Sequence, residues 1–147
     1  MPRRTAACVM SRAPRYLPTS RKKGRPNVPD GKICYLEIPA TDAEVSAAFY
    51  ANVFGWRSRL RGDGHRAFDD TTGEVSGSWV LGRPASGEPG ILTYVMVDRI
   101  DATLAKVSAA GGRVATPLTP LGGTGEAFAT FFDPAGNLLG LYQEPTR

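Results

Sequence analysis

Residues 35–56 read YLEIPATDAEVSAAFYANVFGW, and this stretch decides how the rest of the chain is interpreted. The alternating β-branched run over residues 33–38 predicts a strand. Asp42 then precedes an alanine-rich amphipathic segment that continues to Phe54 and is followed by Gly55. A carboxylate before such a segment and a glycine after it are typical of the two ends of a helix. The stretch therefore predicts a strand followed by a helix.

The same pattern returns in the second half of the chain. Residues 92–97 predict another strand, and Asp101 precedes a helical pattern that ends at Ala110 before two glycines. When the two halves are aligned with an offset of 59 residues, Tyr94 matches Tyr35 and Asp101 matches Asp42. Each aspartate would act as an N-cap or as a first-turn carboxylate that favours the positive end of the helix dipole.

Three short strands are predicted after each helix, because turn residues divide the chain there. These strands cover residues 56–61, 65–69 and 75–81, and then 113–118, 127–132 and 138–143. Residues 84–90 contain two prolines and two glycines and are predicted to link the halves. We therefore predict an α+β domain over residues 31–147 that contains two βαβββ modules, residues 31–83 and 91–147.

The first 30 residues differ from the rest in composition. The chain has a net charge of +4, yet residues 1–30 hold eight Lys and Arg residues against one Asp, together with five prolines. We predict that this basic, proline-rich tail is disordered, because it has no apolar periodicity. It could be a nucleic-acid-binding arm, an organelle transit segment, an idle tail, or the result of a start upstream of the true one. The acidic excess of the remaining residues argues against nucleic-acid binding by the domain.

We predict a cytoplasmic protein. No apolar run approaches the roughly 20 residues that a membrane helix needs, and the apolar core of a secretory signal is missing. Cys8 and Cys34 are too few for a disulfide framework, and Cys34 is expected to face the first helix as a small buried residue. The sequence leaves open whether the protein is a monomer or a homodimer.

Three separated strings resemble segments of the vicinal oxygen chelate superfamily, which includes glyoxalases, bleomycin resistance proteins and dioxygenases. They are YLEIPATDAEVSAAFYANVFGW, VDRIDATLAKVSAAGGRV and FFDPAGNLLGLYQ, and they occur in the order that the family shows. The resemblance covers residues 31 to about 145. It implies that the two modules form a curved mixed sheet around a shared cavity, with the helices outside.

The resemblance and the alternation of side chains along a strand together predict which residues face this cavity. In the first strand, Leu36 and Ile38 should pack on the helix. The residues expected to line the ligand cavity are Tyr35, Glu37, Val80, Tyr94, Met96 and Gln143. We therefore expect a small organic molecule to bind among these side chains.

Metal-dependent members of the family take four ligands from the first and last strands of each module, typically His or Gln together with Glu. Matching Gly77 with Gly140 aligns the two last strands. The four ligand positions then fall on Tyr35, Val80, Tyr94 and Gln143. Tyrosine has a pKa near 10 and valine has no donor atom, so this set does not suit a divalent ion. We expect no metal, no other cofactor, and neither a metal-dependent lyase nor a dioxygenase activity.

Glu37 is the polar residue in this set that could carry chemistry. Beside a tyrosine hydroxyl it could transfer protons in a metal-free isomerase or lyase, or it could simply satisfy a hydroxyl or a backbone amide. The only histidine, His65, is expected to be a surface or packing residue. Our leading hypothesis is a metal-independent protein that binds a small molecule. The alternatives are the Glu37 enzyme and a structural module whose partner recognition lies in the tail.

Overall fold

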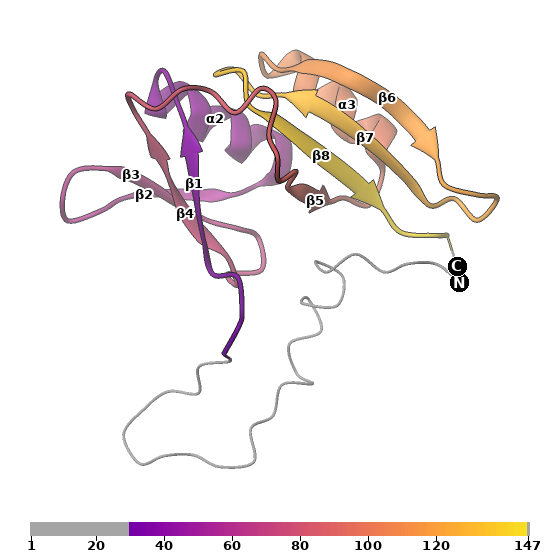
Figure 1. The fold of residues 1–147 in the computed structure, drawn as a ribbon, viewed down its shortest axis with the longest axis horizontal. Coiled ribbons are helices and arrows are strands. Elements are labelled where there is room, and N and C mark those ends of the chain that lie inside the picture. Colours follow the sequence, from indigo (N-terminus) through magenta and orange to yellow (C-terminus); the bar gives the residue numbers. More distant parts are fainter. Residues whose placement is uncertain (1–29, 147) are drawn as a thin grey trace, which may run out of the picture.

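The structure, a computed structural model, describes residues 30–146 and contains two βαβββ modules in succession (Figure 1). The first module contains β1 (Tyr35–Pro39), α2 (Ala43–Phe54), β2 (Arg57–Leu60), β3 (Arg66–Asp69) and β4 (Ser76–Val80). The second contains β5 (Tyr94–Met96), α3 (Ile100–Ala109), β6 (Arg113–Pro120), β7 (Ala127–Phe132) and β8 (Leu138–Gln143). The predicted α+β class and the tandem modules are confirmed. The expectations for the tail fall on residues 1–29, outside the described part.

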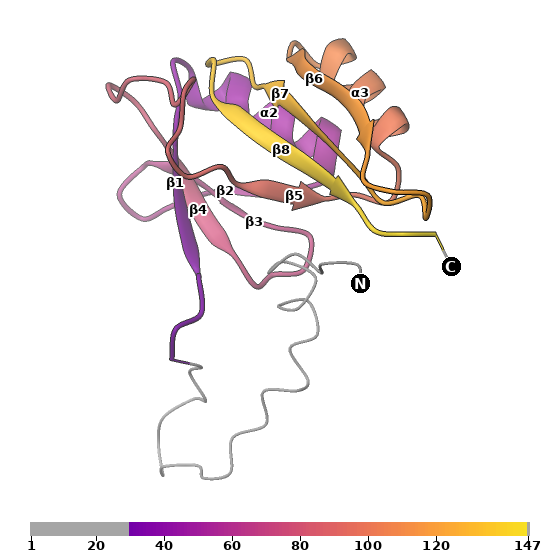
Figure 2. The same ribbon diagram turned by 45° about the vertical axis from the view of Figure 1, so that its right-hand side comes forward.

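Each module forms its own four-stranded mixed sheet. The strand orders are β1-β4-β3-β2 and β5-β8-β7-β6. In each sheet the first strand runs parallel to the last, and the other pairs are antiparallel. The expected curved sheet around a cavity is therefore made of two sheets that lie next to each other and do not close (Figure 2).

The ends of the helices follow from local chemistry. Asp42 is the N-cap of α2, and its carboxylate accepts two backbone N–H groups. Gly55 ends the helix with a φ of 74°, a left-handed conformation that glycine adopts without strain. In α3 the N-cap is Arg99, whose side chain makes no capping bond, and Asp101 lies in the first turn. Within residues 30–146, no helix is long and apolar enough to cross a membrane.

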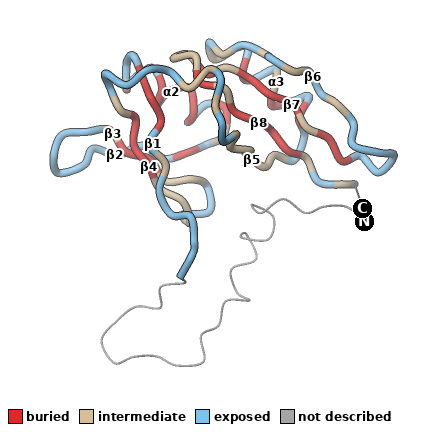
Figure 3. The backbone as a smooth tube through the Cα atoms, in the orientation of Figure 1, coloured by how far each residue is buried: buried red, intermediate tan, exposed pale blue. Residues whose placement is uncertain are grey.

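Both modules contribute to one hydrophobic core, which lies between the sheets and the helices. Figure 3 shows buried residues along the central strands β4, β7 and β8. The ring of Tyr50 stacks on Trp56 with centroids 4.9 Å apart, and Trp56 stacks on Phe68 at 4.7 Å. Phe49 of α2 reaches Phe131 of the second sheet at 6.0 Å. Helix α2 therefore packs against both modules and joins them into one core.

A buried polar network ties the first module to the turn between β7 and β8. The Tyr50 hydroxyl donates to the Asp133 carboxylate at 2.8 Å. The Asn137 amide donates to the same carboxylate at 2.8 Å and to the Pro39 carbonyl at 2.7 Å. Burial raises the pKa of Tyr50 well above its usual value, and the Asp133 charge adds to this effect. The hydroxyl therefore remains a donor throughout the neutral pH range.

This network generates the first prediction. Asn137→Ala should lower the free energy of unfolding by about 2 to 4 kcal/mol, because it leaves a buried carboxylate and a buried carbonyl short of donors. Urea denaturation measures the effect. Glu88→Gln is the control, because Glu88 is exposed and should change stability by less than about 0.5 kcal/mol. Equal stability of the two variants would contradict a structural role for the network.

Candidate functional site

The first strand distributes its side chains between two faces, as alternation predicts. Leu36 and Ile38 pack into the core, whereas Tyr35 and Glu37 are exposed on the opposite face. The expectation for Cys34 was wrong, because this residue is exposed. The strand begins only after Cys34, so alternation within the sheet does not govern its side chain.

A pocket of about 290 Å³ lies between the two modules, and Tyr94 and Met96 line it. Its walls are mainly apolar, and we call it the junction pocket. It is lined by Leu36, Trp56, Phe68, Asp70, Thr71, Thr72, Glu74, Val75, Thr93, Tyr94, Val95 and Met96. The core side of the first sheet, the turn between β3 and β4, and strand β5 thus meet around one space.

Glu37 lies away from this pocket, beside the segment that links the modules. Its carboxylate pairs with the Arg83 guanidinium, and the two side chains are 46% and 50% exposed. The Tyr35 hydroxyl bonds instead to Arg61, at 3.0 Å. The structure therefore does not form the pair of Glu37 and a tyrosine hydroxyl that metal-free proton transfer requires.

Gln143 lies at the start of α3. Its side-chain oxygen accepts the Ile100 N–H at 2.9 Å, and its amide donates to the Gly125 carbonyl at 2.8 Å. The first amides of a helix lack partners within the helix, and α3 has no side-chain cap of its own. Gln143 supplies the missing acceptor, so the structure uses this residue to hold a helix end.

The open face of the first sheet carries a polar network that we did not predict. Arg59 binds the Asp69 carboxylate through two N–H groups at 3.1 and 3.3 Å, and the Ser76 hydroxyl donates to the same carboxylate at 2.6 Å. The sequence signal was the alternation RSRLR over residues 57–61, which places arginines on one face of a strand.

The model of the Glyoxalase/Bleomycin resistance protein/Dioxygenase superfamily matches residues 32–141, nearly all of the folded part. The chain belongs to this superfamily. The chain is 30% identical over 130 residues to the putative glyoxylase CFP32 of Mycobacterium tuberculosis, a match that covers 83% of this chain and 46% of the relative. It thus spans about half the length of that protein.

Two further likenesses agree with this assignment. A glyoxylase-like domain-containing protein of Didymella fabae is 32% identical over 125 residues, which cover 78% of this chain and 95% of the relative. The crystal structure of the fosfomycin resistance protein FosX from Listeria monocytogenes superposes with a TM-score of 0.64 at 15% identity, covering 78% of this chain and 91% of that one. The latter likeness concerns the fold alone.

The strand register of this glyoxalase-superfamily domain corrects the alignment of the two modules. Tyr35 pairs with Ser76 in the first sheet, and Tyr94 pairs with Gly140 in the second. Matching Gly77 with Gly140 is therefore wrong by one residue. Because a slip of one residue turns a side chain to the other face of a sheet, Val80 and Gln143 do not occupy equivalent places in the two modules.

The residues that pair with the two tyrosines are Ser76 and Gly140, whereas Val80 pairs with Pro39 and Gln143 pairs with Ala127. The Ser76 hydroxyl already donates to a carboxylate, and glycine has no side chain. Among residues 30–146, no three His, Cys, Asp or Glu side chains are grouped so that they could hold a metal ion. The donor set at these positions does not fit the divalent metal that many members of the superfamily bind.

Gly140 has a steric role beside Tyr94. A Cβ atom at position 140 would lie 2.4 Å from two carbon atoms of the Tyr94 ring, a distance that real contacts do not reach. The glycine thus allows the ring to lie against β8. The Tyr94 ring also lines the junction pocket. The shape of this pocket therefore depends on Gly140, although Gly140 is not one of its lining residues.

The second prediction follows from this contact. Gly140→Ala should lower the free energy of unfolding by about 1 to 3 kcal/mol, because the added methyl group displaces the Tyr94 ring. In the Gly140→Ala/Tyr94→Ala double variant the two effects should be clearly less than additive. Gly90→Ala is the control, since no atom lies within 4 Å of a Cβ there. Strict additivity in denaturation experiments would show that the ring does not need the glycine.

Proposed function

We propose that this domain binds a small, largely apolar organic molecule in the junction pocket, without a metal ion. The supporting observation is the pocket itself, which has a volume of about 290 Å³ and apolar walls from both modules. Sites for small molecules are usually apolar concavities of about 300 to 1,000 Å³ that contain a few polar groups. This volume is at the lower end of the range and favours a ligand of one or two rings.

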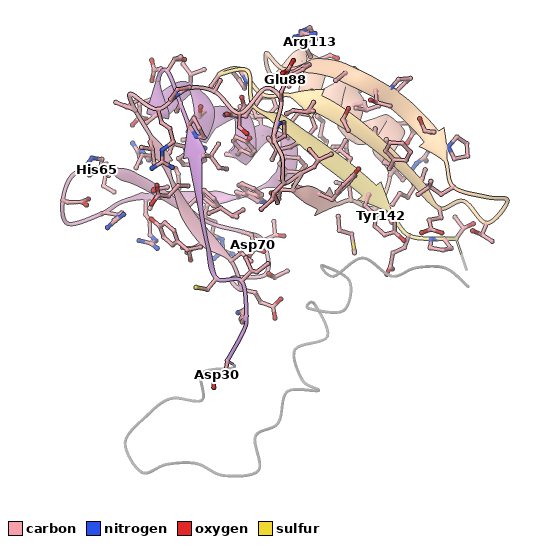
Figure 4. All side chains as sticks on the ribbon, viewed as in Figure 1. Asp30, His65, Asp70, Glu88, Arg113 and Tyr142 are labelled. Atoms are coloured by element: carbon pink, nitrogen blue, oxygen red, sulfur yellow. The ribbon has the colours of Figure 1, made fainter. Side chains whose placement is uncertain are left out.

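The polar groups at the rim of the junction pocket favour binding over catalysis. Asp70, at the turn between β3 and β4 (Figure 4), accepts the Thr72 hydroxyl at 2.8 Å and the backbone N–H of Glu74 at 3.1 Å. It also accepts the Val75 N–H at 3.4 Å. Through these hydrogen bonds the Asp70 carboxylate stabilises the turn. Glu37 lies outside the pocket and is paired with Arg83, so the pair of Glu37 and a tyrosine hydroxyl is not formed there.

We also propose that residues 31–147 form one domain, in which residues 84–90 link the modules. The support is the core that both modules share. Ligand binding would therefore be a property of the whole domain, because a separate module would lack one wall of the junction pocket.

The third prediction tests the location of the ligand. Indole and similar one-ring or two-ring compounds should raise the melting temperature of the full chain, because a ligand that binds only the folded state stabilises it. Val75→Trp should abolish this increase by filling the pocket. Leu118→Trp is the matched control, since Leu118 is 39% exposed on the distant strand β6. An undiminished increase in the Val75→Trp variant would place binding elsewhere.

The fourth prediction concerns the metal. We expect the purified chain to contain less than a tenth of an equivalent of zinc, nickel, iron or manganese, because Tyr35, Ser76, Tyr94 and Gly140 offer a poor donor set. Elemental analysis measures the content, and a chelator should leave both the melting temperature and compound binding unchanged. About one bound ion per chain would refute metal independence, whatever the outcome of the pocket experiment.

A further inference from the structure

The open face of the first sheet, opposite the helices, concentrates guanidinium groups near the Tyr35 hydroxyl. Arg57 and Arg59 alternate along β2, and Arg61 follows in the same alternation, so all three side chains leave from one face. Strand pairing continues this face across the sheet. One row runs from Arg57 through Asp69 and Ser76 to Tyr35.

Tyr35 crosses the sheet to reach these arginines. Between them lie the small residues Ala67 and Ser78, which are only 1% and 5% exposed although no helix covers this face. The Tyr35 hydroxyl accepts from Arg61 at 3.0 Å. The pKa of Arg59 is raised, chiefly by its hydrogen bond to Asp69 and in smaller part by Tyr35. The phenol therefore contacts one of these guanidinium groups directly, that of Arg61.

Several hydrogen-bond donors on this face remain available to a ligand. The Tyr35 hydroxyl acts as an acceptor from Arg61, so its own proton is left to donate. Arg57 forms no ion pair with any of the residues that the structure describes. Arg59 and Arg61 pair with Asp69 and Asp63, but each guanidinium carries five N–H groups and uses only some of them.

The charges around these donors favour a small anion over a polyanion. Asp63 and Asp69 lie among the arginines, and hydrogen bonds from the His65 backbone and from Arg59, respectively, lower their pKa values. Both carboxylates are therefore ionised at neutral pH and interrupt the basic surface. The ring of His65, at the tip of the β2–β3 hairpin (Figure 4), lies 3.2 Å from the Asp63 carboxylate. A nucleic-acid backbone needs a continuous row of cations, whereas one oxyanion needs only two or three converging donors.

We propose that this face binds a single oxyanion group, a carboxylate or a phosphate, through the guanidinium groups of Arg57, Arg59 and Arg61 and the hydroxyl of Tyr35. Charge-assisted and bidentate hydrogen bonds from arginine match the geometry of both groups. The site is separate from the junction pocket. That pocket is lined by Leu36 and Phe68, which point to the opposite face of the same sheet.

The test is a titration of the isotope-labelled full chain with sodium phosphate, and separately with sodium acetate, followed by amide NMR at constant ionic strength. We expect saturable shifts at residues 35, 57–61 and 76–78, and the anion that binds more tightly identifies the class. Arg59→Gln/Arg61→Gln should weaken binding at least ten-fold. Tyr35→Phe, which removes the hydroxyl that donates to the anion and accepts from Arg61, should weaken it about three-fold.

Arg113→Gln is the matched control, because Arg113 lies over the Phe132 ring of the second sheet, 4.4 Å from its centroid, and should not affect the titration. If the double arginine variant does not fold, Arg57→Gln gives an equivalent test, because it breaks no ion pair. Shifts that grow linearly without saturation, or that are the same in every variant, would overturn the proposal. Neither result would affect the junction pocket, which apolar compounds test separately.

Discussion

The arrangement of the two modules depends on one buried carboxylate, that of Asp133. Tyr50 donates to it from the first module and Asn137 from its own turn, and Asn137 also binds the Pro39 carbonyl of β1. A buried charge is tolerated only with its hydrogen bonds in place, so the carboxylate selects the module arrangement that supplies them. Apolar contacts such as that between Phe49 and Phe131 add packing energy but are far less directional. The network therefore helps to fix the relative position of the two modules, which supply the walls of the junction pocket.

The elements of the fold could be predicted because their causes are local. Strand alternation in residues 33–38, the N-cap at Asp42 and the left-handed glycine at position 55 each involve residues a few positions apart. The repeat at 59 residues extended the same reasoning to the second module. The buried network was not predictable in this way, since Tyr50 and Asp133 are 83 positions apart and only the folded chain brings them together.

The candidate site was predicted less well, because strand register depends on contacts between distant segments. Gly77 and Gly140 look equivalent in the sequence, and each makes room for an aromatic ring. Gly77 does so for Phe68 on the core face, whereas Gly140 does so for Tyr94 on the opposite face. Because glycine has no side chain, the sequence does not indicate on which face of the sheet a neighbouring ring lies against it. The resulting error of one residue made Val80 and Gln143 look equivalent, whereas Val80 pairs with Pro39 and Gln143 holds the start of a helix.

The contact between Tyr94 and Gly140 also bears on how this member of the superfamily differs from those that bind metal. A carboxylate introduced at position 140 would need a Cβ atom where the Tyr94 ring now lies, 2.4 Å away. Such a ligand could enter only if the tyrosine were replaced as well. The two positions therefore depend on each other, and no single substitution at either one leads from the present packing toward a metal site. The Tyr94 ring is also a wall of the junction pocket, so any substitution that made room for a side chain at position 140 would change the shape of that pocket as well.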